Sequence, residues 1–374
     1  MRLSALSVLF LSFALAAEEG FVPMFNGKDL SGWVNANCAP ETWSVKDGVI
    51  CCTGKPIGAL RTERQYENFI LEAEWRHLSS GGNSGIFIWG TPISAPGQPF
   101  LRGIEVQVLD HGFNAKGKNE WYTTHGDVFP IHGATMKPLG KSNGKRSFPS
   151  EERSKPSPEW NHYRIECNNG SIRLHVNGKQ VSGGDECNYR KGYLALESEG
   201  APVEFRNVRI KELPTTNTPA ELTAPLDEGF RPLYTGVDLR NWRDADKAAA
   251  RWQVSDWTLS QKKAEGDARH DLVSEAEYGD AEFIVDLKPK AALTDKPFGV
   301  KVRSSAAVPL AADALPANKW TRIKVRVQGA ELTCWIGDKQ QSAKLDGAPA
   351  RGALVLIDSG GNIDVANIFV RELK

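Results

Sequence analysis

The feature that most constrains the fold is an internal repeat, because three segments of the first half recur in the second half. The pairs are FNGKDLSGW (25–33) with YTGVDLRNW (234–242), WNHYRIE (160–166) with WTRIKVR (320–326), and FRNVRIKEL (205–213) with VANIFVREL (365–373). The first pair is offset by 234 − 25 = 209 residues. The other two pairs share one offset, because 320 − 160 and 365 − 205 both equal 160. A chain of 374 residues with such a repeat is most economically explained as two copies of one unit.

Each copy is predicted to be all-β. Short runs of alternating apolar and polar residues are separated by Gly, Asn, Asp and Pro turns, and no long helical stripe is present. TWSVKDGVICC at 42–52 predicts a hairpin that turns at Lys46, Asp47 and Gly48. Residues 214–229 are rich in Pro, Thr and small residues, which indicates a linker between domains at 18–213 and 230–374.

The two copies differ in one long piece. Gly85 in NSGIFIWG matches Gly299 in FGVKVRS at an offset of 214, so 214 − 160 = 54 residues are missing from the second copy before Trp320. The missing piece contains RGIEVQVLD (102–110) and an irregular connection at 111–159. A connection of this length is either disordered or functional, and its aromatic and histidine content favours function. Any chemistry is therefore expected in the first copy.

RGIEVQVLD has the pattern of a strand with polar groups on one face. Ile104, Val106 and Val108 would enter the core, whereas Glu105 and Gln107 would point the other way. Asp110 would join Glu105 only if a β-bulge near Leu109 turned it round. Two carboxyls and an amide on one wall suit acid–base chemistry on a sugar, and the alternative is a solvent-facing strand edge.

Composition and the N-terminus narrow the class of protein. Lys+Arg and Asp+Glu balance at 46 each, without a dense basic run, so no nucleic-acid partner is expected. Residues 1–17 have the pattern of a cleaved signal peptide and are too short for a comfortable membrane span, which predicts a secreted or periplasmic protein without a transmembrane segment.

The six cysteines are compatible with disulfides in an exported chain. Plausible pairs are Cys38 with Cys51 or Cys52, and Cys167 with Cys187, which leaves Cys334 alone. No CxxC or Cys/His spacing supports a metal site at these cysteines.

Several motifs of the first copy together resemble the 3-keto-disaccharide hydrolase domain family of secreted bacterial proteins. They are FNGKDLSGW, the W-x-V-x-D-G-V-I of 43–50, NSGI, GIEVQVLD, the KP–EWN pattern of 155–161, VNGK and EFRNVRIKEL, and they cover about residues 21–213. The resemblance implies a concanavalin-like jelly roll with a carbohydrate cleft across a concave sheet. The second copy resembles the same fold without its distinctive centre. We therefore expect two tandem concanavalin A-like jelly-roll β-sandwiches.

The same fold houses laminarinase-like glucanases, whose catalytic strand has the form E-x-D-x-x-E. Glu105-x-Gln107-x-x-Asp110 is similar in spacing, but it has an amide at the middle position and a shorter carboxylate at the last. These departures disfavour ordinary retaining hydrolysis, which needs a nucleophile and an acid at a fixed separation.

The chemistry implied by the family resemblance needs a base and an acid. A carbonyl at C3 acidifies the proton at C2, so a base removes it while an acid assists departure of the group at C1, and water then adds. Glu105 or Asp110 would be the base. His132, with His125 or Lys137, would protonate the leaving oxygen or stabilise the enolate. A divalent cation held by the carboxylates and a histidine could do the latter instead, but the sequence shows no clear ligand triplet.

Other residues of the first copy are candidates for substrate binding. Gln107 would orient the sugar, Trp89 and Trp121 would stack on a ring, and Arg102 would bind hydroxyl groups. The sequence thus predicts a hydrolase of 3-keto-glycosides or 3-keto-disaccharides, and an eliminating lyase would use nearly the same residues. The alternatives are a non-catalytic lectin-like protein and a structural cell-surface protein.

Overall fold

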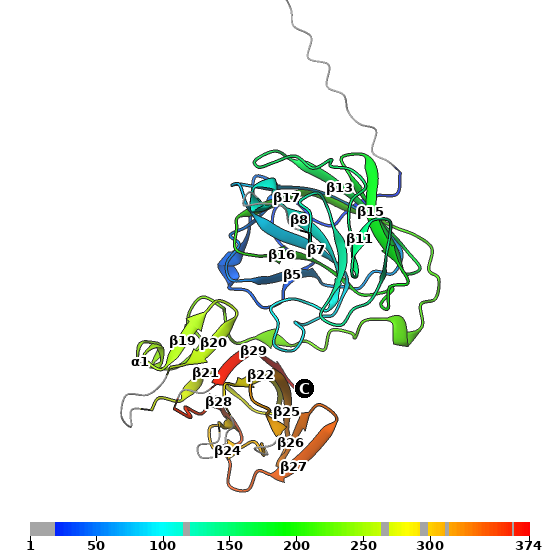
Figure 1. Ribbon diagram of the computed structural model, residues 1–374. Helices are drawn as coiled ribbons and strands as arrows, with labels where there is room; N and C mark the ends of the chain where they lie inside the picture. The colour runs from blue at the N-terminus through cyan, green and yellow to red at the C-terminus, as the bar shows by residue number, and fades with distance from the viewer. Residues whose placement is uncertain (1–18, 115–119, 263–268, 292–297, 311–313, 361–362) are drawn as a thin grey trace, which may run out of the picture.

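The computed structural model describes residues 19–114, 120–262, 269–291, 298–310, 314–360 and 363–374. Almost all of its elements are antiparallel strands, which fall into an N-terminal body (β1–β17) and a C-terminal body (β18–β29) (Figure 1). The prediction of an all-β protein with two tandem sandwiches is confirmed. The predicted signal segment lies outside the described residues. Within the described part of the chain, no helix has the length and apolar character needed to cross a membrane.

The N-terminal body consists of two sheets, named here sheet 1 and sheet 2. Sheet 1 runs β10 (Lys137–Pro138), β15 (Lys179–Asp185), β14 (Ser171–Val176), β13 (Asn161–Asn168), β6 (Phe69–His77), β17 (Val203–Glu212), β4 (Val49–Cys52) and β3 (Trp43–Lys46), with β1 (Val22–Pro23) beside β17. Sheet 2 runs β11 (Ser142–Asn143), β12 (Arg146–Ser147), β9 (Val128–Ile131), β8 (Gly103–Leu109), β7 (Asn83–Gly90), β16 (Tyr193–Ser198), β5 (Gly58–Thr62) and β2 (Trp33–Asn35). Two short 3-10 helices, η1 (Pro40–Thr42) and η2 (His111–Asn114), lie in the connections.

The C-terminal body also has two sheets. Sheet 3 runs β19 (Trp252–Ser255), β20 (Thr258–Gln261), β29 (Ile363–Glu372), β22 (Ala281–Pro289), β25 (Thr321–Gln328), β26 (Glu331–Ile336) and β27 (Lys339–Lys344), with β18 (Arg231–Pro232) beside β29. Sheet 4 runs β21 (Leu272–Tyr278), β28 (Gly352–Leu356), β23 (Val300–Val302) and β24 (Ala306–Ala307). A short helix, α1 (Ala245–Ala249), precedes β19, and η3 (Ala220–Leu222) lies between the two bodies in the chain.

The repeat in the sequence is also a repeat of strands. β13 begins at Asn161 and β25 at Thr321, an offset of 321 − 161 = 160, and β3 and β19 begin at Trp43 and Trp252, an offset of 252 − 43 = 209. β6 lies between β13 and β17 in the same way as β22 lies between β25 and β29. Sheet 2 continues past β7 through β8, β9, β12 and β11, whereas sheet 4, in its described residues, ends past β23 with the two-residue β24.

The core of the N-terminal body lies between sheets 1 and 2. Ile104, Val106 and Val108 are all 2% exposed or less and belong to this core, as the alternation of β8 predicts. Each such side chain contributes about 1.5–3 kcal/mol through its burial. Glu105 and Gln107 therefore point to the outer face of sheet 2.

Residues 214–229 do not form a free spacer. Glu67 accepts hydrogen bonds from Thr215 Oγ1 at 2.7 Å and from the Thr216 amide at 2.8 Å, and Arg61 pairs with Asp227 at 2.5 Å. The segment is thereby held along the N-terminal body.

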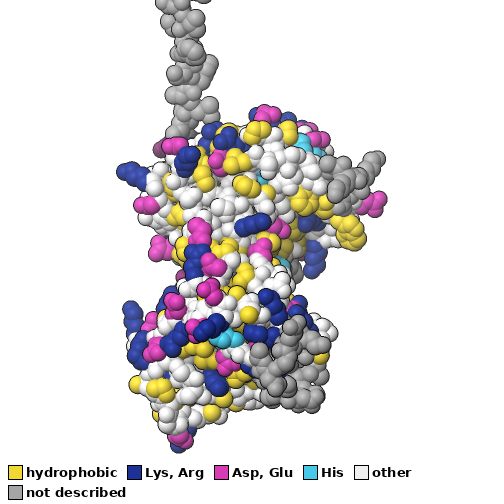
Figure 2. All heavy atoms as spheres, turned by 90° about the vertical axis from the view of Figure 1, so that its left-hand side faces the viewer, with side chains coloured by type: hydrophobic (Ala, Val, Ile, Leu, Met, Phe, Trp, Pro, Cys, Tyr) yellow, Lys and Arg dark blue, Asp and Glu magenta, His cyan; other side chains and the backbone are white. Residues whose placement is uncertain are grey.

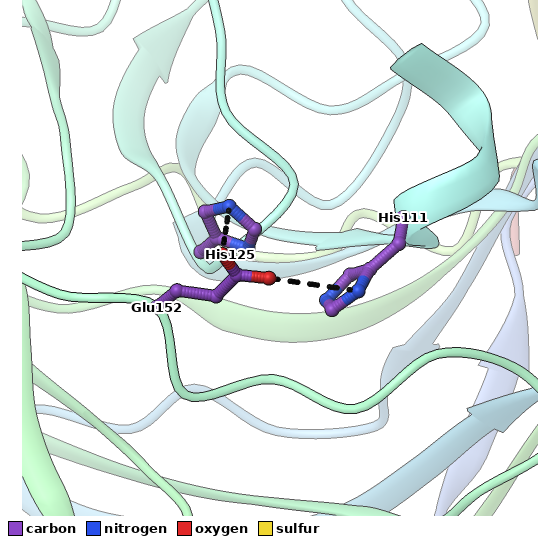
Figure 3. Close-up of side chains that lie close together, drawn as sticks. All are labelled: His111, His125 and Glu152. Atoms are coloured by element: carbon purple, nitrogen blue, oxygen red, sulfur yellow. Dashed lines mark ion pairs between the residues drawn. The ribbon is translucent and has the colours of Figure 1, made fainter. Parts of the chain in front are cut away.

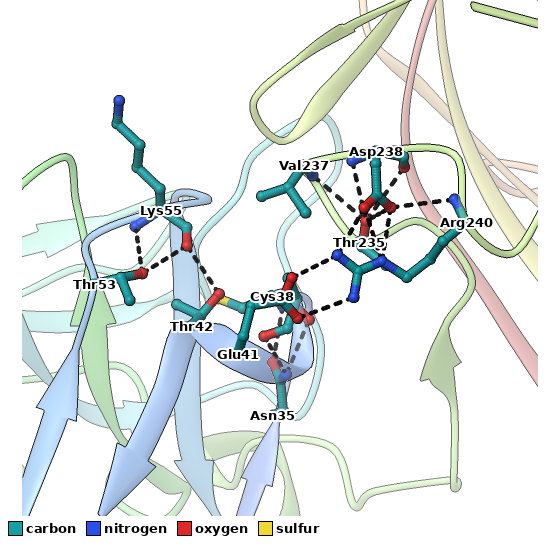
Figure 4. A network of polar contacts seen from close by, with 11 residues as sticks. Asn35, Cys38, Glu41, Thr42, Thr53, Lys55, Thr235, Val237, Asp238 and Arg240 are labelled. Carbon is teal, nitrogen blue, oxygen red and sulfur yellow. Dashed lines mark hydrogen bonds and ion pairs between the residues drawn. The ribbon is translucent and has the colours of Figure 1, made fainter. Parts of the chain in front are cut away.

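The two bodies touch through polar contacts. Arg240 pairs with Glu41 across the junction (Figure 4), and the Ile57 amide donates to Asp256 Oδ1 at 2.6 Å. Figure 2 shows the corresponding shape, two lobes joined at a narrower waist, with basic and acidic side chains interspersed on the face in view.

The cysteine pairings expected from the sequence are wrong. All six cysteines are free thiols in the structure: Cys38, Cys51, Cys52, Cys167, Cys187 and Cys334. Five of them are buried, and Cys51 is half-buried. Burial raises the pKa of Cys52 to about 11, which keeps that thiol protonated and unreactive.

Candidate functional site

A cavity of about 310 Å³ lies on the outer face of sheet 2, and we call it the acidic pocket. Three carboxyls line it: Glu105 from β8, Glu197 from β16 and Glu199 just after β16. The other lining residues are Asn83, Phe100, Gln107, Leu109, Phe113, Tyr122, Phe129, Ile131, His132 and Arg146. Six of them come from the connection 111–159, so the segment that the second copy lacks builds much of the wall.

Strand register brings two of the carboxyls together. β7 lies between β8 and β16, with Gly85 opposite Gln107 and Ile86 opposite Leu196. A Cβ atom at Gly85 would lie 2.8 Å from Glu197 Oε2 and 3.0 Å from Glu105 Oε1. The two carboxyls therefore reach over Gly85 toward the same point, and only glycine leaves them that space.

Burial makes the acidic pocket hold protons at neutral pH. Burial, with the neighbouring Glu199 adding to it, raises the pKa of Glu105 to about 8. Burial and the two other acids also raise the pKa of Glu197, whose carboxylate oxygens accept no hydrogen bond from an N–H or hydroxyl group of the described residues. Glu199 is half-buried, and burial raises its pKa to about 7. The pocket thus places a protonated acid beside a carboxyl that titrates near neutrality.

One guanidinium faces these acids. Arg146 lies on β12, with its centre 3.3 Å from the Phe129 ring centroid, and its Nη1 donates to Gln107 Oε1 at 3.2 Å and to Asp127 Oδ2 at 3.1 Å. Gln107 in turn donates from Nε2 to Asn83 Oδ1 at 3.0 Å. The positive charge is therefore fixed in place before any ligand arrives.

His132 lies between two cavities. Its ring stacks on Phe100, with ring centroids 6.3 Å apart, and its buried Nε2 has no hydrogen-bond partner among the described residues. Burial lowers the pKa of His132, so the ring is neutral at pH 7. The second cavity, also about 310 Å³, lies between the two bodies and is lined by His132, Arg102 and Arg322 among others.

The structure corrects the expectation for Asp110. No register shift interrupts the pairing of β7 with β8, so the expected bulge at Leu109 is absent from these described strands. Asp110 is 2% exposed, lies outside the acidic pocket, and accepts hydrogen bonds from the amides of Gly81, Gly112 and Ser157. Burial works against its ionisation, but these hydrogen bonds outweigh burial and lower the pKa of Asp110. Asp110 therefore holds the neighbouring loops in place and does not act as an acid–base group.

The two predicted tryptophan platforms lie elsewhere. Trp89 is 0% exposed in the core, and its indole donates to the Glu67 carbonyl at 2.9 Å, so the prediction that it stacks on a sugar is wrong. Trp121 is 74% exposed and precedes Tyr122, which does line the acidic pocket.

The predicted cationic residues also lie outside the acidic pocket. Lys137 is on β10 of sheet 1 and pairs with Glu186 at 3.7 Å. Arg102 donates to Tyr189 Oη at 2.9 Å beside the second cavity. His125 Nε2 lies 3.6 Å from Glu152 Oε2, beside a different surface cavity. Of the predicted residues, the structure thus brings together Glu105, Gln107 and His132.

Glu197, Glu199 and Arg146 were missed by the sequence analysis, and the repeat contains the signal that identifies the first two. At the offset of 160 that relates the copies, GYLALESE (192–199) matches GALVLIDS (352–359), which puts Ile357 and Ser359 in place of the two acids. A Cβ atom at Gly299 would meet Ile357 Cδ1 at 2.4 Å, just as one at Gly85 meets Glu197. In the second copy the side chain still packs over the glycine, but uncharged residues replace Glu197 and Glu199.

Fold and site define a β-sandwich protein with an acidic pocket on the outer face of one sheet. Residues 20–211 match the family of 3-keto-alpha-glucoside-1,2-lyase-like domains, and the chain belongs to this family of carbohydrate-active proteins.

Individual relatives carry related names. A 3-keto-disaccharide hydrolase of Bacteroides thetaiotaomicron is 24% identical over 253 residues, covering 52% of this chain and 79% of the relative. A solved structure from Parabacteroides distasonis, provisionally assigned as a glycosyl hydrolase, is 25% identical with a TM-score of 0.40 and covers 52% of this chain and 95% of that one. Carbohydrate-binding module CBM66 of Bacillus subtilis is 13% identical with a TM-score of 0.37, covering 51% and 100%. The family assignment rests on the sequence match.

Proposed function

We propose that the acidic pocket cleaves 3-keto-glycosides by removing the proton at C2 and expelling the group at C1, after which water adds to the product. The observation that carries the proposal is the set of two buried carboxyls and one half-buried carboxyl with raised pKa values, because such a set supplies an acid and a base at the same pH.

The environments of the carboxyls suggest their roles. Glu199 is the least buried and has a pKa of about 7, so it is the base that takes the C2 proton. Glu105, with a pKa of about 8, is protonated at neutral pH and is the acid for the leaving oxygen. This assignment replaces the expectation that Glu105 or Asp110 is the base.

Two further groups support the reaction. Arg146 lies against the pocket wall, where its charge would stabilise the enolate that forms at C3. His132 is neutral and would hydrogen-bond the substrate through its unpartnered Nε2.

A lectin-like function is the alternative, but the pocket favours catalysis. Burying two neighbouring carboxyls beside a half-buried third is costly, and a site that only binds sugar hydroxyl groups would gain nothing from it. In keeping with this, the second copy has an isoleucine and a serine at the positions of Glu197 and Glu199.

The test compares one disaccharide in its 3-keto form and its unoxidised form. The protein should cleave only the keto form, and Glu105→Gln and Glu199→Gln should each lower kcat by about 100-fold or more, within the range expected for loss of a general acid or base. Glu166→Gln, which changes a carboxyl of sheet 1 paired with Arg164, is the matched control and should retain activity. Binding of the keto sugar without turnover would assign the lectin function instead.

Two expectations from the sequence join this proposal. Export would be directed by residues 1–17, and the domains would span 18–213 and 230–374, the second being a degenerate copy without the catalytic insertion. N-terminal sequencing of the exported protein, showing a start near residue 18, tests the first of these.

A further inference from the structure

Outside the acidic pocket, two histidines and a glutamate from three different segments face one another (Figure 3). His111 is on η2, His125 lies in the loop before β9, and Glu152 lies in the loop before β13. All three belong to the connection 111–159.

The three side chains present one donor atom each to a common point. His111 Nδ1 lies 3.7 Å from Glu152 Oε1, and His125 Nε2 lies 3.6 Å from Glu152 Oε2. One atom from each residue lies within 4.8 Å of the other two. A tetrahedral zinc ion with bonds of about 2.0–2.1 Å holds its ligand atoms about 3.3–3.4 Å apart, so a small closing movement suffices.

Ser154 fixes which ring nitrogen of His111 is available. Its Oγ donates to the Thr124 carbonyl at 3.0 Å, and it has no second proton to give. His111 Nε2 lies 2.8 Å from Oγ, so Oγ accepts from this nitrogen. The opposite nitrogen, His111 Nδ1, is then the lone-pair atom, and it faces the Glu152 carboxylate. His125 Nδ1 lies 3.4 Å from both Ser154 Oγ and Thr124 Oγ1, and its Nε2 faces the same carboxylate. Outer hydrogen bonds of this kind orient histidines at metal sites.

We propose that His111, His125 and Glu152 bind a divalent first-row transition metal ion, with Zn²⁺ the best match, and that Ser154 orients the His111 imidazole. Two imidazole nitrogens and a carboxylate oxygen are a donor set that zinc prefers, and a water molecule completes the tetrahedron. A cation also removes the repulsion between the His111 lone pair and the carboxylate that it faces.

The ion has a route to this site. The Glu152 side chain is 59% exposed, and His125 lines an open surface cavity of about 610 Å³. Neither ligand needs local unfolding to become accessible.

The bound ion would cross-link the wall of the acidic pocket. Phe113 follows His111 on η2, and its ring packs edge-on against Tyr122 with centroids 5.8 Å apart. Both rings line the acidic pocket. Joining η2 to the loops that carry His125 and Glu152 therefore holds these two rings in place. This inference does not depend on the reaction that the pocket performs.

The test is calorimetric titration of the full-length, untagged protein with ZnCl₂ after treatment with EDTA. We expect one ion per chain, at least 100-fold weaker binding in His125→Gln and Glu152→Gln, and about 10–100-fold weaker binding in Ser154→Ala. Glu152 is exposed, so its variant should keep the fold, which circular dichroism checks. His175→Gln is the matched control, because His175 is also 23% exposed and lies 3.7 Å from a carboxylate, Glu166, and among the described residues this pair belongs to no three-ligand group.

Two outcomes would overturn the proposal: no saturable zinc binding by the wild-type protein, or undiminished binding in both His125→Gln and Glu152→Gln. Cobalt, used as a spectroscopic replacement, should show a four-coordinate spectrum without a thiolate charge-transfer band, and such a band would place the metal at a cysteine. Hydrogen exchange of peptides covering 120–131 and 150–160 should slow when zinc binds. Unchanged exchange would refute the cross-linking role.

Discussion

The raised pKa of Glu105 makes stability depend on pH in a direction opposite to that of most surface acids. Its pKa rises from 4.5 to about 8 on folding, because burial disfavours the charged form. The folded protein therefore holds a proton that the unfolded chain releases above pH 4.5. The stabilisation is fully present below pH 4.5 and is lost as the pH rises through 8.

The size of the effect follows from this difference. At about 1.4 kcal/mol for each pH unit, the interval from 4.5 to 8 sets an upper limit of about 5 kcal/mol. Glu199 lies in the same pocket and has a pKa close to that of Glu105, so part of this free energy comes from the interaction between the two acids. For Glu105 itself we expect a contribution of about 2–5 kcal/mol to the free energy of unfolding.

The assay measures the free energy of unfolding in urea at pH 5, 6, 7, 8 and 9 for the wild type and for Glu105→Gln. The wild type should lose about 2–4 kcal/mol more than the variant between pH 5 and pH 9, because glutamine fills the same volume without titrating. Glu166→Gln should follow the wild type. Parallel curves for the wild type and Glu105→Gln would show that Glu105 ionises normally, and the assignment of Glu105 as the acid would be wrong.

Three further predictions concern single positions. Gly85→Ala should keep the fold but lower kcat by about 100-fold, because its Cβ displaces both neighbouring carboxyls; unchanged kinetics would contradict the geometry of the pocket. Asp110→Ala should destabilise the protein by about 2–4 kcal/mol in urea, since buried amides lose their acceptor, while kcat of the folded fraction stays the same; a selective loss of kcat would restore Asp110 to the catalytic site. Asp286→Ala should cost about 3–5 kcal/mol, because buried Asp286 pairs with Arg322 and accepts from the Gly97 amide, and equal melting temperatures would refute this.

The sequence predicted the strands well because their side chains alternate in burial. The run NSGIFIWG was expected at 83–90, and β7 has those bounds. The hairpin turn expected at Lys46 to Gly48 is present, with positive φ at Asp47 (51°) and Gly48 (75°). Local pattern is sufficient for such features, because the turn residues and the period of two act over a few positions.

The site was predicted only in part because it depends on contacts between distant strands. Glu105 and Gln107 were found on β8 itself, but Glu197 lies more than 90 positions later in a run that is otherwise apolar. Its position beside Glu105 follows from the register of β7 with its two neighbours, which one strand cannot reveal. Asp110 was misassigned because β8 ends at Leu109 and the chain turns into η2.

The loop between β7 and β8 is held by the other half of the molecule. Arg322 donates to the Ser94 carbonyl at 2.8 Å, Asn367 donates to the Ala95 carbonyl at 3.1 Å, and Gly97 lies so close to the Trp320 ring that a Cβ atom would clash with it. The same loop continues into Phe100, which lines the acidic pocket. A fragment that ends at residue 213 would keep every carboxyl of the pocket and lose this brace. The second sandwich therefore serves as a scaffold for a loop that lines the pocket of the first.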